Sequence, residues 1–183
     1  MQNPVDFQFD ESISIFDNLQ KLNASLWSAV GRLDINTSCL LLFTTDGALA
    51  NKLMHPSAEI EREYAVRVLG EVTDDMLKAM KTGVELEDGM AHFDNIADAG
   101  GTGANHWYHV ILREGRKREV RRLWESQGVR VSRLQRIRFG GVTLPRGLRS
   151  GKWIDLDGEE LSGLYESAGL SLPVEEKKTT QRK

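Results

Sequence analysis

Asp34 is the residue of this sequence whose type and surroundings are best suited to chemistry. It lies in the polar loop GRLDINTS, residues 31–38, between the apolar segments Ala29–Gly31 and Leu40–Phe43. A carboxylate held beside an arginine at the edge of a sheet can act on a substrate. An aspartate in such a loop more often caps a turn, so the residues alone leave both interpretations open.

Other reactive side chains form no pattern typical of a catalytic or metal site. Among the four histidines, His106 and His109 are three residues apart in an expected strand and therefore point to opposite faces of the sheet. The single cysteine, Cys39, lies beside an apolar run, which favours a core position and excludes an internal disulfide. The glycine-rich residues 100–103 lack the Lys-Ser/Thr ending of a phosphate-binding loop and predict a hairpin turn. We expect neither a metal nor a nucleotide at these residues.

Positive charge is concentrated between residues 113 and 149, which we call the basic segment. It contains 12 Arg or Lys residues, all but one of them Arg, and only 3 acidic residues, so its net charge is +9. The rest of the chain carries −12, which gives the whole protein a net charge of −3. A solvated charged face would mix both signs, so we favour a surface that binds a polyanion, most simply a nucleic acid.

Length and composition limit the class of protein. The 183 residues suit one domain, and 40% hydrophobic with 28% charged residues suit a protein with one sizeable core. No apolar run reaches the roughly 18 residues of a membrane span, and the first residues lack the basic and apolar pattern of a secretory signal. With a single cysteine, we expect the protein in the reducing cytoplasm. By default, we expect a monomer.

Hydrophobic periodicity and turn residues predict an α+β fold with a mixed, mainly antiparallel sheet and flanking helices. Residues 62–69 alternate, so that Tyr64, Val66 and Val68 share one face of a strand. Short links between the expected strands exclude parallel crossovers there. Strands are expected at residues 29–31, 40–43, 62–69, 91–97, 106–113, 129–138, 142–144 and 152–156, and helices at 48–54, 74–81, 117–127 and 159–168. We also expect a short amphipathic segment within residues 1–25 and a disordered tail at 171–183.

Three longer stretches carry a resemblance to a known family. They are GRLDINTSCLLLFTTDGALANKLMHP, EREYAVRVLGEV and EGRKREVRRLWESQGVRVSRLQRIRFGGVTLPRGLRSGKW, in the family's order, and the resemblance spans about residues 13–165. The chain resembles the bacterial rRNA pseudouridine synthases, in the group that modifies single sites of small- or large-subunit RNA. The resemblance implies isomerisation of a uridine in a ribosomal RNA stem-loop, expected in the large subunit, without a metal, nucleotide or redox cofactor.

The resemblance also implies roles for five residues. Asp34 matches the essential aspartate, which starts cleavage of the bond between base and sugar by attacking the base, attacking the sugar or removing a sugar proton. Tyr64 matches the tyrosine expected to stack on the uracil, and Arg121 matches the basic residue expected to pair with the aspartate. Arg32 is expected to contact the backbone of the flipped nucleotide. Leu123 is expected in the pocket wall, although it fits the core face of a helix equally well.

The expected reaction suggests a function for the basic segment. A uridine must leave its stack before a carboxylate can reach it, and this costs a few kcal/mol. Arginines that bind phosphates on either side of the uridine would offset part of that cost and make binding depend on salt.

This sequence differs from the family pattern in two respects. Family members usually begin with a small RNA-binding domain and a strand containing Lys-Pro; neither is found, so we expect residues 1–170 to be a catalytic domain without its N-terminal part. Cys39 stands where the family motif has glycine, and a strained loop is expected if that position needs a positive φ. The alternative function is therefore an RNA-binding remnant that does not catalyse. A nuclease would require metal ligands.

Overall fold

The computed structural model of the chain describes residues 27–32, 38–102, 105–149 and 151–173. Its strands are β1 (Ser28–Val30), β2 (Ser38–Cys39), β3 (Leu42–Thr44), β4 (Arg62–Leu69), β5 (Val84–Leu86), β6 (Gly89–Ala91), β7 (Asn95–Thr102), β8 (Asn105–Leu112), β9 (Arg130–Phe139) and β10 (Val142–Thr143). Its helices are α2 (Gly47–Met54), the short 3-10 helix η1 (Pro56–Ala58), α3 (Asp74–Thr82), α4 (Glu119–Ser126) and α5 (Gly158–Ser167).

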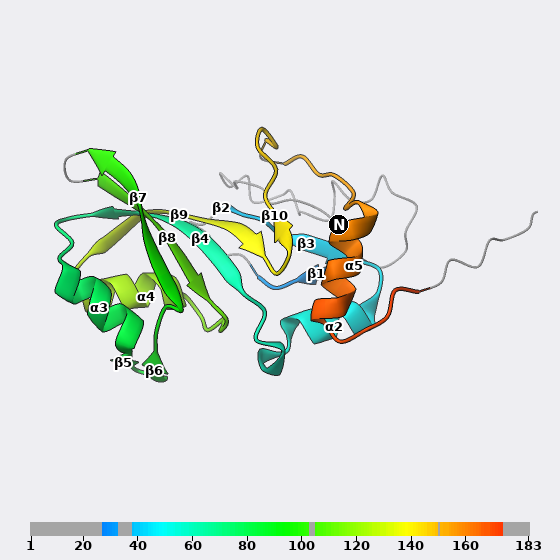
Figure 1. Cartoon of the computed structure of the whole chain (residues 1–183), viewed down its shortest axis with the longest axis horizontal. Helices are drawn as coiled ribbons and strands as arrows, with labels where there is room; N and C mark the ends of the chain where they lie inside the picture. Colours follow the sequence, from blue (N-terminus) through cyan, green and yellow to red (C-terminus); the bar gives the residue numbers. More distant parts are fainter. Residues whose placement is uncertain (1–26, 33–37, 103–104, 150, 174–183) are drawn as a thin grey trace, which may run out of the picture.

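One sheet extends across most of the described protein (Figure 1). Its strands are in the order β10-β9-β4-β8-β7, and all of these neighbours are antiparallel. Strand β2 also pairs with β9, in parallel, with Ser38 opposite Gln135 and Cys39 opposite Arg136. Two smaller antiparallel pairs are β1–β3 and β5–β6. The architecture confirms the predicted α+β fold with a mixed, mainly antiparallel sheet and flanking helices.

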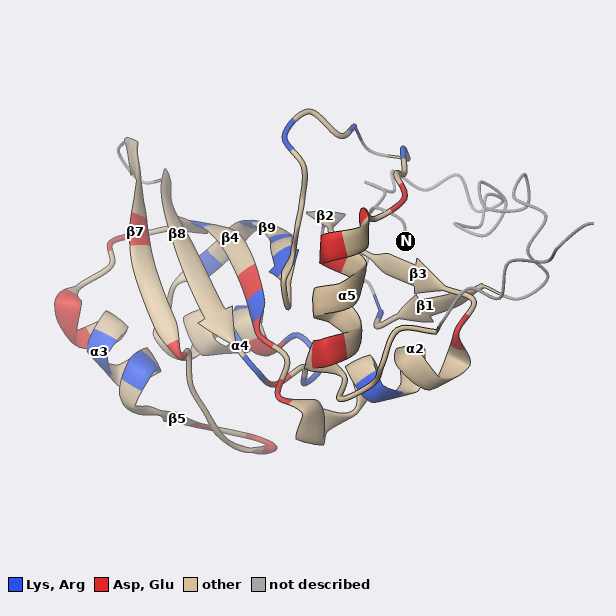
Figure 2. Ribbon diagram, turned by 45° about the vertical axis from the view of Figure 1, so that its right-hand side comes forward, with Lys and Arg blue, Asp and Glu red and all other residues tan. Residues whose placement is uncertain are grey.

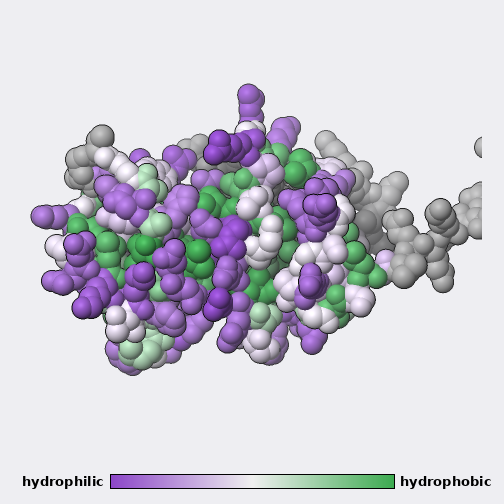
Figure 3. Space-filling model, viewed as in Figure 1, coloured by the Kyte–Doolittle hydropathy of each residue, from purple (hydrophilic) through white to green (hydrophobic). Residues whose placement is uncertain are grey.

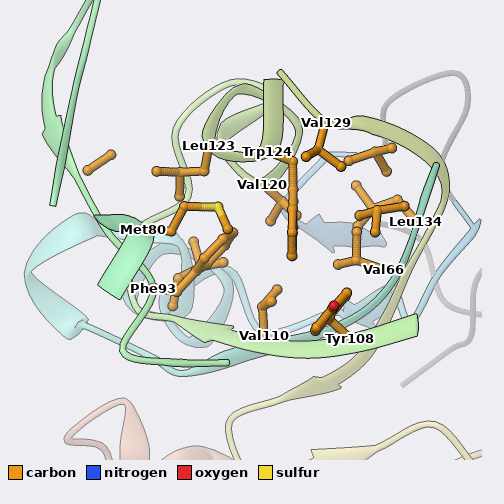
Figure 4. Packing of buried hydrophobic residues seen from close by; sticks show 14 residues of the cluster. Val66, Met80, Phe93, Tyr108, Val110, Val120, Leu123, Trp124, Val129 and Leu134 are labelled. Carbon is orange, nitrogen blue, oxygen red and sulfur yellow. The ribbon is translucent and has the colours of Figure 1, made fainter. Parts of the chain in front are cut away.

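A first hydrophobic core lies between the sheet and helices α3 and α4 (Figure 4). The alternation of β4 turns Val66 and Val68 into this core, where both are completely buried. The ring centroid of Trp124, from α4, lies 6.3 Å from that of Phe93 and 5.1 Å from that of Tyr108. This packing holds α4 against the sheet.

A second core lies around helices α2 and α5. It includes Leu53 of α2, Leu164 of α5 and Phe139 of β9. Asp46 caps the first turn of α2, and the hydroxyl of Tyr165, from α5, donates to the same carboxylate at 2.8 Å. Because β9 contributes side chains to both cores, it connects the two parts of the molecule.

The structure confirms most of the predicted elements and corrects three expectations. Residues 100–102, expected in a hairpin turn, belong to strand β7. Strand β4 has the predicted bounds, and α3 begins after Thr73 and ends at Gly83, whose φ is 126°. Residues 152–156 do not form the expected strand: they pair with no strand in the described part, and Leu156 packs on the second core instead. The strand expected at 91–97 is divided between β6 and β7, and the hairpin β5–β6 has no counterpart in the sequence-based expectation.

The amphipathic segment expected within residues 1–25 lies outside the described residues. Of the tail expected to be disordered at 171–183, only residues 171–173 are described, and they form no helix or strand. In the part that the structure describes, no helix is both long and apolar enough to span a membrane. The same ranges contain no group of three or more His, Cys, Asp or Glu side chains able to hold a metal ion. Hydrophilic side chains cover much of the face shown in Figure 3, with hydrophobic ones in groups between them.

Leu123→Ala is expected to lower the free energy of unfolding by about 2–5 kcal/mol, because Leu123 is completely buried and its removal leaves a cavity. Met54→Ala is the control, at a side chain that is 44% exposed, and should change the free energy by less than about 0.5 kcal/mol. Urea denaturation measures both variants. Equal, small effects would contradict the core position of Leu123.

Candidate active site

The loop that contains Asp34 is fixed at both of its ends, while residues 33–37 lie outside the described part. Before the loop, Val30 pairs with Leu42, and Gly31 turns the chain with a φ of 98° that favours glycine. After the loop, β2 pairs with β9. The chain therefore leaves this loop at the edge of β9.

Arg136 of β9 bonds to the residue Leu40 after the loop and lies near Gly31 at its start. Its Nε and Nη2 donate to the carbonyl oxygen of Leu40 at 2.9 and 2.6 Å, and the Leu40 amide donates to the Arg136 carbonyl at 2.9 Å. A β-carbon added to Gly31 would lie 3.8 Å from Nη1 of Arg136. Arg136 is 5% exposed, so its charge acts where water screens little. In the sequence, Arg136 looks like any other arginine of the basic segment. Because side chains alternate along a strand, Arg136 lies on the same inward face as Leu134, two residues before it, and this spacing could have predicted its burial.

Tyr64 lies opposite Arg136 in the register of β4 with β9, on the face that packs on the first core. Burial raises the pKa of the Tyr64 hydroxyl, and the charge of Arg136 opposes this rise only in part. Tyr64 is therefore an uncharged phenol at neutral pH. A neutral aromatic ring can stack on a flat base, while its hydroxyl makes hydrogen bonds.

The other three residues singled out by sequence have different environments. Arg121 approaches β9 from α4: its Nη1 donates to the carbonyl oxygen of Val131 at 3.1 Å, and the residue is 8% exposed. Arg32, at the start of the loop, is exposed. Leu123 is completely buried in the first core beside Trp124 (Figure 4), so the structure places it in packing and not at an accessible surface.

Arg62 is a buried residue of this region that sequence reasoning missed. Its Nη1 donates to the carbonyl oxygen of Ile60 at 2.8 Å and to two carbonyls of the loop before α4. Its guanidinium lies 5.1 Å from the ring centroid of Phe139, and that of Arg136 lies 5.3 Å from the same centroid. Arg62 thus ties the start of β4 to the segment that leads into α4.

Glu119, the first residue of α4, is the second charged residue missed by sequence reasoning. It is 2% exposed; one carboxylate oxygen accepts the amide of Arg116 at 3.0 Å, and the other has no hydrogen-bond partner among the described residues. Burial raises the pKa of its carboxyl to about 7. In the described ranges the buried charged residues are Glu119 and three arginines, Arg62, Arg121 and Arg136. This excess of buried positive charge favours an anion such as a carboxylate or a phosphate.

Most arginines of the basic segment are buried or form ion pairs with carboxylates of the same protein. Fewer basic side chains than the sequence suggested are therefore available to bind a polyanion. Arg138 donates to Glu63 at 2.9 Å, and both Nη atoms of Arg122 donate to Asp88 at 2.7 and 2.8 Å. Acidic and basic residues accordingly lie next to each other at the start of β4 (Figure 2). These carboxylates come from outside the segment, so its net charge by sequence does not reveal them. The members that are exposed and have no carboxylate within ion-pair distance in the described part are Lys117, Arg130, Arg133, Arg146 and Arg149.

Cys39 is buried in β2, as expected for a core residue. In the described part, the residues other than glycine with a positive φ are Glu59 and Arg118. Cys39 therefore has an ordinary strand conformation, and the strain expected from replacing a glycine is absent at this position.

Comparison with known proteins defines the class to which this fold and loop belong. The sequence profile of the RNA pseudouridylate synthase family matches residues 2–126, which include Asp34, Tyr64 and Arg121. The chain belongs to this family. It is similar to the ribosomal large subunit pseudouridine synthase B of Haemophilus influenzae, with 59% identity over 164 residues, and to that of Yersinia pestis, with 58% identity over 168 residues.

These alignments cover 90% and 88% of this chain but 46% and 53% of the two relatives. The chain thus spans about half the length of the curated relatives that it matches. A crystal structure of a pseudouridylate synthase matches with a TM-score of 0.74 and 23% identity, over 90% of this chain and 71% of that one. At this identity the likeness concerns the fold, and it agrees with the fold type expected from the sequence.

Glu119→Gln is expected to remove a pH dependence of stability. Because the pKa of Glu119 is raised to about 7, the folded protein keeps a proton that the unfolded chain releases, and the stability of the wild type falls as pH rises towards and through 7. The neutral variant should therefore gain stability relative to the wild type between pH 5 and 8, by about 1–3 kcal/mol. Urea denaturation at several pH values measures this difference, and parallel curves for the two proteins would contradict it.

Proposed function

We propose that this protein isomerises a uridine of large-subunit ribosomal RNA to pseudouridine, with Asp34 as the catalytic residue. The observation that carries the proposal is the GRLD motif in a chain of the RNA pseudouridylate synthase family. The large-subunit substrate follows the names of the relatives, of which this chain spans about half. The proposal includes a monomeric enzyme of the cytoplasm that needs no metal, with residues 1–170 as its catalytic domain.

The reaction exchanges one bond for another within a single nucleotide. N1 of the uracil separates from C1′ of the ribose, the base rotates, and C5 bonds to C1′. C5 loses a proton and N1 gains one, so the reaction requires no oxidant or reductant. Attack by Asp34 on the base, attack on the sugar and removal of a sugar proton each begin with an ionised carboxylate. Arg121 is proposed to pair with this carboxylate, because a neighbouring positive charge favours and orients the ionised form.

Three further side chains support this reaction. Tyr64 is proposed to stack on the uracil as an uncharged ring, and the exposed Arg32 to contact the nucleotide backbone. Arg136 is proposed as a positioning residue, because its guanidinium and its backbone both bond to Leu40, where the chain leaves the Asp34 loop. Leu123 has no role in this proposal beyond packing.

Asp34→Asn is expected to abolish turnover and to leave RNA affinity within about twofold, since the amide keeps the shape of the carboxylate but cannot ionise. The measurement is release of tritium from RNA labelled at C5 of uridine, on fragments of large-subunit rRNA. A folded wild type that binds RNA and releases no tritium would favour the RNA-binding remnant. RNA cleavage that EDTA abolishes would favour a nuclease.

Arg136→Lys is expected to lower turnover by about tenfold to a hundredfold with little change in RNA affinity. Lysine keeps the charge but cannot donate two parallel N–H groups to the Leu40 carbonyl, so the loop loses its fixed position. Arg113→Lys, at a half-exposed arginine paired with Glu61, is the control and should keep full turnover. A thermal melt checks that both variants are folded, and equal turnover of the two would exclude a positioning role for Arg136.

A further inference from the structure

The sheet has a face that no described helix covers. On β8, Tyr108 and Val110 point into the first core, while Trp107 and His109 between them stay partly exposed. The same alternation places Arg67 of β4 on the exposed side. Helix α4 packs on the opposite, core side, behind β8 and β4 in Figure 2. We call this exposed side the outer face; it is the side of β4 opposite to Tyr64.

One end of the outer face joins an aromatic ring to three arginines. Arg67 lies directly opposite Trp107 on one neighbouring strand and opposite Arg133 on the other. Its guanidinium carbon lies 5.8 Å from the centroid of the Trp107 ring. In the next pair of this face, Leu69 of β4 lies opposite Arg130 of β9, and the Leu69 side chain is 41% exposed. We call Arg67, Leu69, Trp107, Arg130 and Arg133 the tryptophan end.

The charges of the tryptophan end are not balanced within the described protein. Like charges directly opposite on adjacent strands are unfavourable, as for Arg67 and Arg133. Among the described residues no carboxylate lies within ion-pair distance of Arg67, Arg130 or Arg133, and the Nε of Arg67 donates to the hydroxyl of Ser132 at 3.0 Å. At the other end of the same face, by contrast, Arg138 is paired with Glu63. An unbalanced cluster of arginines is complementary to an anion.

The shape of this end suits a chain of nucleotides. Small side chains, Ala65 on β4 and Ala97 on β7, lie in the next row of the sheet on either side of His109. His109 is therefore the only large side chain among these three residues of the row. Open sheet faces with an exposed aromatic ring bind single-stranded nucleic acid by stacking a base on the ring, while nearby arginines contact phosphates.

We propose that the tryptophan end is a second RNA-binding surface, which holds single-stranded RNA flanking the modified stem-loop. A base stacks on Trp107, and phosphates contact Arg67, Arg130 and Arg133. This inference rests on the RNA substrate proposed above. Because the tryptophan end and Tyr64 lie on opposite faces of β4, the RNA that reaches both passes around the sheet. The surface therefore contributes to the affinity for long RNA and not to the chemistry of the uridine.

The test compares a minimal stem-loop with the same stem-loop extended by about eight single-stranded nucleotides, a length within the site sizes of such surfaces. For the wild type, the extension should tighten binding at least tenfold. Arg130→Gln with Arg133→Gln should lose most of this gain and lower the slope of log Kd against log salt by about 1.4, or about 0.7 for each phosphate contact. Its affinity for the minimal stem-loop and its tritium release from it should stay unchanged.

Two controls separate this surface from general charge and from misfolding. Lys78→Gln with Lys81→Gln removes the same charge from exposed positions of α3, on the core side of the sheet, and should keep the gain from the extension. Trp107→Phe, which keeps a ring, should bind the extended RNA within about threefold of the wild type, while Trp107→Leu should lose about tenfold. Thermal melts confirm that each variant is folded.

Three results would overturn the proposal. The first is equal binding of the two RNAs by the wild type, the second an equal loss on both RNAs in the Arg130 and Arg133 double variant, and the third the same loss in the lysine control. A gain from the extension that depends on these residues, in a protein without tritium release, would support the surface while rejecting the proposed reaction. The two proposals can therefore fail separately.

Discussion

The candidate site depends on the contact between β2 and β9. In the described sheet this is the one parallel pairing, and it is only two residues long. Arg136 strengthens it, because its backbone carbonyl and its guanidinium bond to the amide and the carbonyl of Leu40. Tyr64 and Arg121 come from β4 and α4, and both elements are packed on β9. Without this contact, the end of the Asp34 loop would have no fixed position relative to either side chain.

Local signals were sufficient for the elements that repeat a regular pattern. The alternation of residues 62–69 gives β4 with its correct bounds, and the cap at Thr73 with the glycine at Gly83 gives α3. The periodicity of apolar residues indicates which side chains face a core, however, and does not show which strand a segment pairs with. Residues 152–156 look like a strand because Trp153, Ile154 and Leu156 are apolar, but they pair with no described strand. Leu156 packs on the second core, whereas Ile154 is 40% exposed. The short hairpin β5–β6 has too few residues to show a period.

The site could be predicted from sequence only in part. Motif resemblance singled out Asp34, Tyr64 and Arg121, whereas the residues alone favoured a turn for Asp34. The buried charges Arg62 and Glu119 were missed, because a charged side chain is ordinarily expected at the surface. Their burial depends on carbonyls and amides supplied by other segments, such as the loop before α4. Partners from other segments also explain why the net charge of the basic segment overstates the charge available to RNA: carboxylates elsewhere in the chain pair with several of its arginines.

The contact between Leu40 and Arg136 also has a consequence for folding, because these residues are 96 positions apart in the chain. Contacts between distant positions form late, since a long stretch of chain must first be ordered to bring them together. During synthesis the segment with Asp34 leaves the ribosome well before β9, so it cannot form this contact until β9 has also been made. A chain interrupted before residue 136 would contain the complete aspartate motif and lack the strand that holds it.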